Sequence, residues 1–143
     1  MTRRLPGIFI ITVLTAFLLS GPVYANTLSA EVTLQSVSGT TASGFAVFTP
    51  HKEGLEVTGF LRDMPPGTYR LLIDEGASCT AATGIAISTT PVINTDQQGR
   101  LKFISILPVL TIEQGNRTII GRRAIIQATE TRTAIACGQV RAR

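Results

Sequence analysis

Few side chains in this chain could carry out chemistry. Its 143 residues include one histidine, His51, which lies in the polar turn 50–54 and is expected at the surface. Ser78 and Thr80 flank a cysteine, but a hydroxyl nucleophile needs an adjacent base. The only histidine, His51, is expected in the surface turn and not beside these hydroxyls, so no base is available to them and a hydrolase of that kind is excluded.

The start of the chain bears on whether the two cysteines, Cys79 and Cys137, are oxidised. A basic start is followed by an apolar run over about 8–19 and by the small-residue site Gly21–Ala25. This pattern predicts a secretory signal peptide, residues 1–25, cleaved after Ala25. The apolar run is too short to span a hydrocarbon core of about 30 Å comfortably, so no membrane span is expected after cleavage. Export to the periplasm or the exterior favours a Cys79–Cys137 disulfide.

The remaining residues, 26–143, are enough for one small domain. Thirteen basic residues less Arg3 and Arg4 leave eleven, against nine acidic residues, so the net charge of this part is +2 rather than the +4 of the whole chain. This charge is small and scattered, and no aromatic or glycine-rich basic cluster accompanies it. Nucleic-acid binding is therefore not expected.

The domain is predicted to be all-β, because apolar and polar residues alternate along short segments separated by turn residues. No segment combines helical periodicity with caps. About eight short antiparallel strands favour a β-sandwich or flattened barrel. The expected strands and extended segments cover residues 28–35, 43–49, 55–60, 69–74, 85–87, 92–95, 101–107, 118–128 and 133–140, and the short segment 109–112 is a strand or a loop.

Three stretches occur in an order that resembles the Cu/Zn superoxide dismutase family. The first is Met64-Pro65-Pro66-Gly67-Thr68-Tyr69-Arg70-Leu71-Leu72-Ile73-Asp74-Glu75-Gly76-Ala77-Ser78-Cys79, and the others are Gly121-Arg122 and Ala136-Cys137-Gly138. The family lines run L-P-P-G-x-H-G-F-H-x-H-E-x-G-x-C, I-I-G-R and A-C-G. The resemblance covers nearly all of 26–143 and implies a Greek-key sandwich with an intrasubunit disulfide.

The family's metal-binding histidines, however, are replaced in this chain. The two copper histidines of the strand after Pro-Pro-Gly fall at Leu72 and Asp74, and the copper histidine of the later strand falls at Gln127. The span that corresponds to the zinc loop, residues 80–95, contains no His, Asp or Glu. Copper favours imidazole ligands and zinc is bound by His, Asp or Cys, so neither metal is expected as a cofactor.

Asp74, Gln127 and Arg132 could form a remnant of such a site. A carboxylate can bind a divalent metal, although a solvated strand end is the favoured interpretation for Asp74. Gln127 lies in an apolar run, and a buried amide must find partners, of which Asp74 is one candidate. The arginine that precedes the final cysteine in the family falls at Ala134, with Arg132 two residues earlier.

Two further patterns are interpreted as having no function of their own. Arg122 and Arg123 could form an anion site with Arg70, but alternation places the first two on opposite faces of a strand, so solvated strand edges are expected. Asn116-Arg117-Thr118 fits the glycosylation pattern and is taken as a chance match, because the short signal looks bacterial.

The leading functional hypothesis is an exported, non-catalytic domain that works through its surface, with an unknown protein or surface partner and with a homodimer left open. The alternative is a residual copper- or zinc-binding protein with superoxide-dismutase-related activity, in which His51 and Asp74 of two chains supply the ligands. A third hypothesis sets the resemblance aside: the protein is a generic exported β-sandwich that binds a protein or a glycan.

Overall fold

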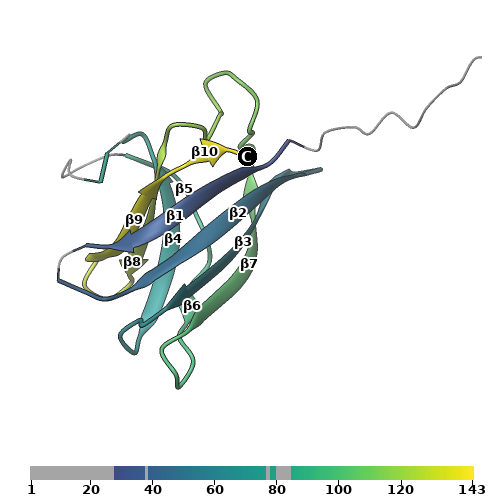
Figure 1. The fold of residues 1–143 in the computed structure, drawn as a ribbon. Coiled ribbons are helices and arrows are strands. Elements are labelled where there is room, and N and C mark those ends of the chain that lie inside the picture. The colour runs from purple at the N-terminus through teal and green to yellow at the C-terminus, as the bar shows by residue number, and fades with distance from the viewer. Residues whose placement is uncertain (1–27, 38, 77, 80–84) are drawn as a thin grey trace, which may run out of the picture.

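The computed structural model describes residues 28–37, 39–76, 78–79 and 85–143. The predicted signal peptide, residues 1–25, lies outside these ranges. Within them the chain is all-β and forms ten strands (Figure 1). Their bounds are β1 (Ala30–Ser36), β2 (Ser43–His51), β3 (Gly54–Arg62), β4 (Thr68–Asp74), β5 (Ala86–Thr89), β6 (Ile93–Asn94), β7 (Leu101–Pro108), β8 (Arg123–Ala128), β9 (Ala134–Gln139) and β10 (Arg141–Ala142).

The strands form a nearly closed barrel in the order β5-β4-β8-β9-β1-β2-β3-β7, with β10 paired to β1 and β6 to β4. All of these strand pairs are antiparallel. We call β10, β1, β2, β3 and β7 the front sheet, and β5, β6, β4, β8 and β9 the rear sheet. The connections from β3 to β4 and from β6 to β7 pass between the sheets, which is the Greek-key arrangement predicted for the fold.

Strand β1 joins the two sheets. Its residues 30–34 pair with β2, whereas Gln35 and Ser36 pair with Cys137 and Ala136 of β9. The close approach of β9 to β1 depends on Gly138, because a Cβ atom there would lie 2.1 Å from the carbonyl oxygen of Thr33. The third residue of the Ala-Cys-Gly stretch is therefore required by backbone contact.

The alternation of apolar and polar residues correctly predicts which side chains lie in the core. In β3, Leu55, Val57 and Leu61 are buried, while Glu56, Thr58 and Phe60 point outward. Burial of such side chains contributes roughly 1.5–3 kcal/mol each. In β4, Tyr69 lies inward and its hydroxyl donates a 2.6 Å hydrogen bond to the carbonyl oxygen of Pro65, which anchors the Pro-Pro-Gly turn. Burial raises the pKa of this hydroxyl.

The sequence prediction is wrong at one strand boundary. Residues 118–128 were expected to form one strand, but β8 begins only at Arg123. Before it, Gly121 adopts a left-handed conformation with φ 80°, and the Arg122 backbone N–H donates to the carbonyl oxygen of Ile119, so a turn interrupts the extended chain. The segment 109–112 is not a strand and contributes only the isolated bridge Thr111–Thr118.

Candidate functional site

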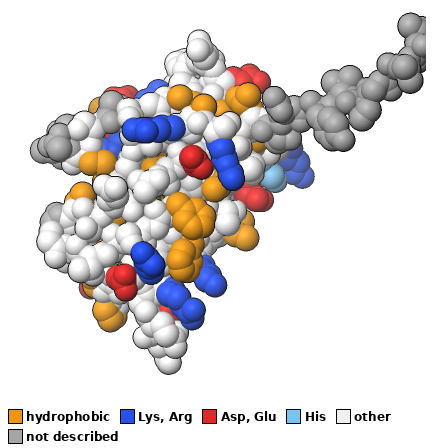
Figure 2. Space-filling model, viewed as in Figure 1, with side chains coloured by type: hydrophobic (Ala, Val, Ile, Leu, Met, Phe, Trp, Pro, Cys, Tyr) orange, Lys and Arg blue, Asp and Glu red, His pale blue; other side chains and the backbone are white. Residues whose placement is uncertain are grey.

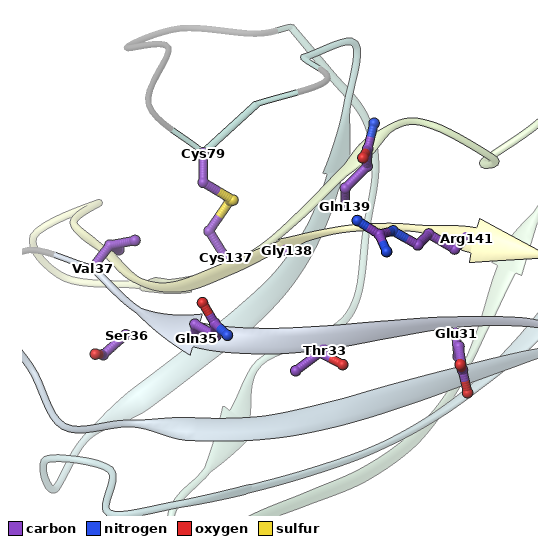
Figure 3. A pocket seen from close by; sticks show the side chains of 10 residues that line it. All are labelled: Glu31, Thr33, Gln35, Ser36, Val37, Cys79, Cys137, Gly138, Gln139 and Arg141. Atoms are coloured by element: carbon purple, nitrogen blue, oxygen red, sulfur yellow. A yellow bond between two sulfur atoms is a disulfide. The ribbon is translucent and has the colours of Figure 1, made fainter.

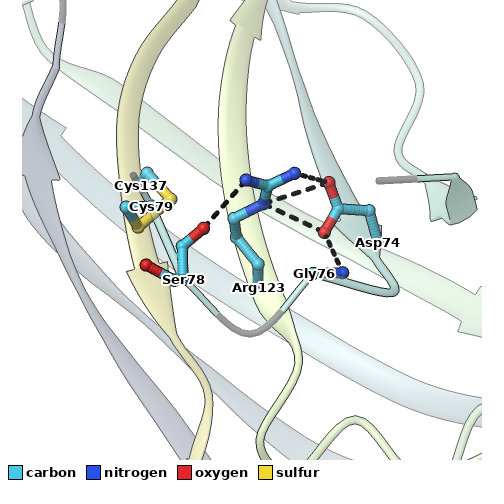
Figure 4. Close-up of a disulfide and its surroundings, with 6 residues drawn as sticks. All are labelled: Asp74, Gly76, Ser78, Cys79, Arg123 and Cys137. Atoms are coloured by element: carbon cyan, nitrogen blue, oxygen red, sulfur yellow. Dashed lines mark hydrogen bonds and ion pairs between the residues drawn. A yellow bond between two sulfur atoms is a disulfide. The ribbon is translucent and has the colours of Figure 1, made fainter. Parts of the chain in front are cut away.

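The predicted disulfide between Cys79 and Cys137 is confirmed, with 5.9 Å between the two Cα atoms. It ties the loop after β4 to the middle of β9 (Figure 4). The position is fixed by the sheet, because Cys137 pairs with Ile125 on one side and with Gln35 on the other. Ser78 and Cys79 are thereby held against the outer surface of the rear sheet.

Beneath this loop lies a buried ion pair between Asp74 and Arg123. The Arg123 Nη2 atom donates to Asp74 Oδ2 at 2.6 Å, and Nε donates to Oδ1 and Oδ2 at 3.0 and 3.1 Å. The side chains are only 5% and 4% exposed, respectively. The expectation that Asp74 is a solvated strand end, and that Arg123 is a solvated strand edge, is wrong for both residues.

The pair forms because Asp74 and Arg123 are directly opposed in the β4–β8 register. The loop that covers them adds two further contacts: the Gly76 backbone N–H donates to Asp74 Oδ1 at 2.9 Å, and Arg123 Nη1 donates to the carbonyl oxygen of Ser78 at 2.9 Å. A Cβ atom on Gly76 would lie 2.9 Å from Arg123 Cζ and 3.0 Å from Asp74 Oδ1, so a larger residue here would require the paired side chains to shift. Two buried charges are thus paired and hydrogen-bonded, as burial of charge requires.

Leu72 lies beside this pair on the same face of the rear sheet. It is half-buried and opposes Ile125 in the β4–β8 register, while Thr89 flanks it on β5. A leucine has no lone pair to donate to a metal, and its aliphatic neighbour gives the position the character of a packing site. Of Leu72, Asp74 and Gln127, Leu72 therefore offers the least to any ligand.

Gln127 takes part in the turn between β8 and β9 instead of in a site with Asp74. Its Nε2 atom donates to the carbonyl oxygen of Arg132 at 3.0 Å, and Arg132 adopts a left-handed conformation with φ 57°. The candidate Asp74–Gln127 hydrogen bond is wrong, because Gln127 is four residues from Arg123 along β8, roughly 13 Å at the rise of a strand. Asp74, Gln127 and Arg132 do not form one cluster.

The remaining candidates lie elsewhere. His51 ends β2 in the front sheet, where its Nδ1 atom accepts from the Glu53 backbone N–H at 3.3 Å. Arg122 is half-buried in the turn before β8, and it donates to the carbonyl oxygens of Thr118 and Asn116 at 2.6 and 2.9 Å. Its predicted place at a solvated strand edge is therefore also wrong. The described residues contain no group of three or more His, Cys, Asp or Glu side chains arranged to hold a metal ion.

A groove of about 610 Å³ lies next to the disulfide, and sequence reasoning did not find it (Figure 3). The disulfide and the strands β1, β9 and β10 line it, with the amides of Gln35 and Gln139 and the opposite charges of Glu31 and Arg141. Glu31 and Arg141 are cross-strand neighbours, a relation that alternation along one strand cannot reveal. The groove provides hydrogen-bond donors and acceptors, but no nucleophile paired with a base lines it.

No family model matches this sequence, and no curated protein does either. Among the described residues, no helix is long and apolar enough to cross a membrane.

Proposed function

We propose that this protein is an exported, superoxide-dismutase-like domain that has lost its copper and zinc ligands and acts as a non-catalytic structural or binding domain. The observation that carries the proposal is the buried Asp74–Arg123 pair. At a position where the resemblance would place a copper ligand, a guanidinium group occupies the space next to the carboxylate.

The electrostatics of this pair oppose metal binding. Asp74 accepts hydrogen bonds from Arg123 Nε, Arg123 Nη2 and the Gly76 backbone N–H. A divalent cation would have to displace the guanidinium, which would then remain as a buried positive charge beside the metal, and such a charge is costly without its partner. Leu72 adds no donor, and the Gln127 amide is engaged at Arg132.

The alternative, a residual metal protein with ligands from two chains, is less well supported. Asp74 is only 3% exposed beneath its loop, so a second chain cannot reach it without opening that loop. His51 lies at the end of β2 in the opposite sheet. The disulfide supports export, because such bonds persist in oxidising compartments. The groove beside it supports a binding role.

We predict that the protein does not accelerate superoxide dismutation. The oxidised protein, purified from cells that express the full chain, should be loaded with copper and zinc and assayed against a buffer that contains the same free metal. Equal rates are expected, since no set of imidazoles is available to hold a redox-active copper. Activity that exceeds the metal-only control would contradict the proposal.

A further inference from the structure

The outer face of the front sheet carries an exposed group of large apolar side chains. We call Phe45, Val47, Phe60, Ile104 and Ile106 the front patch. Phe45 is 51% and Ile104 is 71% exposed, and the other three are half-buried. Figure 2 shows apolar side chains gathered on this face, with charged side chains around them. A contiguous patch of this kind on a small domain commonly marks an interaction surface.

The register of the front sheet makes the front patch one surface. Phe45 opposes Phe60, with 6.3 Å between the ring centroids, and Phe60 in turn opposes Lys102. In the next outward-facing row, Val47 and Ile104 flank Thr58. Thr58 separates Val47 from Ile104, and Phe60, the next outward-facing residue of β3, links the two diagonally. The apolar side chains of the three strands are therefore connected through Phe60.

The charges along β3 and β7 are separated by sign. Lys102 lies at one end of the front patch, where Arg62 and Asp63 lie 3.9 Å apart and offset each other, and Glu56, opposite Ile106, lies at the other end. Lys102 Nζ lies 5.7 Å from the centroid of the Phe60 ring. Within the part of the chain that the structure describes, neither Lys102 nor Glu56 belongs to an ion pair. At the β1 border, Glu31 and Arg143 lie 3.7 Å apart and offset each other.

We propose that the front patch docks against the front patch of a second copy of this chain, face to face. A two-fold axis that lies in the interface and runs across the strands places the Lys102 end of one copy over the Glu56 end of the other. A patch with the Lys102 ammonium at one end and the Glu56 carboxylate at the other is self-complementary under this operation. An anionic membrane would attract only the cationic end. The proposal goes beyond the proposed function and does not depend on it.

Sedimentation of the oxidised protein purified from cells that express the full chain tests this directly. At about 100 µM, the expected mass is that of two chains. Ile104→Asp is expected to raise the dissociation constant at least about tenfold, because it places a charge in the middle row of the buried patch. The matched control is Ile85→Asp, since Ile85 is 72% exposed and precedes β5 of the rear sheet. Far-UV circular dichroism checks that both variants fold.

Charge reversal tests the proposed symmetry. Lys102→Glu and Glu56→Lys should each weaken the dimer, because each puts like charges opposite one another, and the double variant should restore it. A protein that stays monomeric, or a dimer that Ile104→Asp leaves unchanged, would overturn the proposal. Two weakened single variants without restoration in the double variant would overturn the two-fold arrangement. Metal content and dismutase activity are independent readouts, so failure here is distinguishable from failure of the proposed function.

Discussion

Arg123→Met is expected to lower the free energy of unfolding by about 3–5 kcal/mol, as when one partner of a buried ion pair is removed. In this variant the Asp74 carboxylate stays buried and, of the hydrogen bonds described above, keeps the one from the Gly76 N–H. The variant also removes the hydrogen bond from Arg123 to the Ser78 carbonyl oxygen. Urea unfolding followed by far-UV circular dichroism measures the change. The matched control is Arg70→Met, because Arg70 is exposed on the same strand as Asp74 and should change stability by less than about 0.5 kcal/mol.

A second variant separates charge from packing in this result. In the double variant Asp74→Leu, Arg123→Met, no charge remains under the loop, and apolar replacement of a buried pair is commonly neutral or stabilising. We therefore expect the double variant to be more stable than Arg123→Met alone. If the single and double variants are equally unstable, the loss comes from the Ser78 contact and from packing, and the buried charge is not its cause.

Loss of the disulfide is expected to be the second large effect. Replacing Cys79 and Cys137 with serine opens a loop of 59 residues (137 − 79 + 1), and the chain-entropy relation gives a loss of about 4 kcal/mol. This is a large part of the roughly 5–15 kcal/mol typical of small domains. Urea unfolding of the oxidised parent, the reduced parent and the double-serine variant measures it. The last two should agree, and a loss below about 1 kcal/mol would contradict the expectation.

The fold could be predicted from the sequence, because alternation and turn residues are local features of the chain. Alternation in residues 55–60 is enough to predict β3 and the side of it that is buried, and the structure places Leu55 and Val57 in the core accordingly. Turn residues such as Gly67 and Gly99 separate these segments. The boundary at Arg123 was missed because it depends on one glycine, Gly121, and on a hydrogen bond from Arg122 to Ile119, neither of which interrupts the apolar pattern.

The candidate site was harder to predict from the sequence, because it depends on which residues of β4 and β8 lie opposite each other. Asp74 and Arg123 are 49 positions apart and meet only once β4 and β8 are aligned. One signal was available: alternation places Asp74 on the same face as Leu72, and Arg123 on the same face as Ile125. Charges that share a face with aliphatic side chains suggest that something covers that face. The covering loop follows from the disulfide, which was itself predicted.

Gln127 and Arg132 were grouped with Asp74 on the resemblance and on the need of a buried amide for a partner, and backbone geometry separates them. The β8–β9 register shifts between Ile126 and Gln127, and the left-handed conformation of Arg132 lets its carbonyl oxygen accept from the Gln127 amide. A bulge and a positive φ at a non-glycine residue leave little trace in composition or spacing. The contact was therefore beyond sequence reasoning.

The most direct test of the central proposal is the metal content of the oxidised protein after loading with copper and zinc and exhaustive dialysis, measured by mass spectrometry. We predict that far less than one copper and one zinc ion per chain is retained, because the Arg123 guanidinium already occupies the Asp74 carboxylate. Retention of close to one tightly bound copper per chain would contradict the proposal, and would require ligands other than Leu72, Asp74 and Gln127.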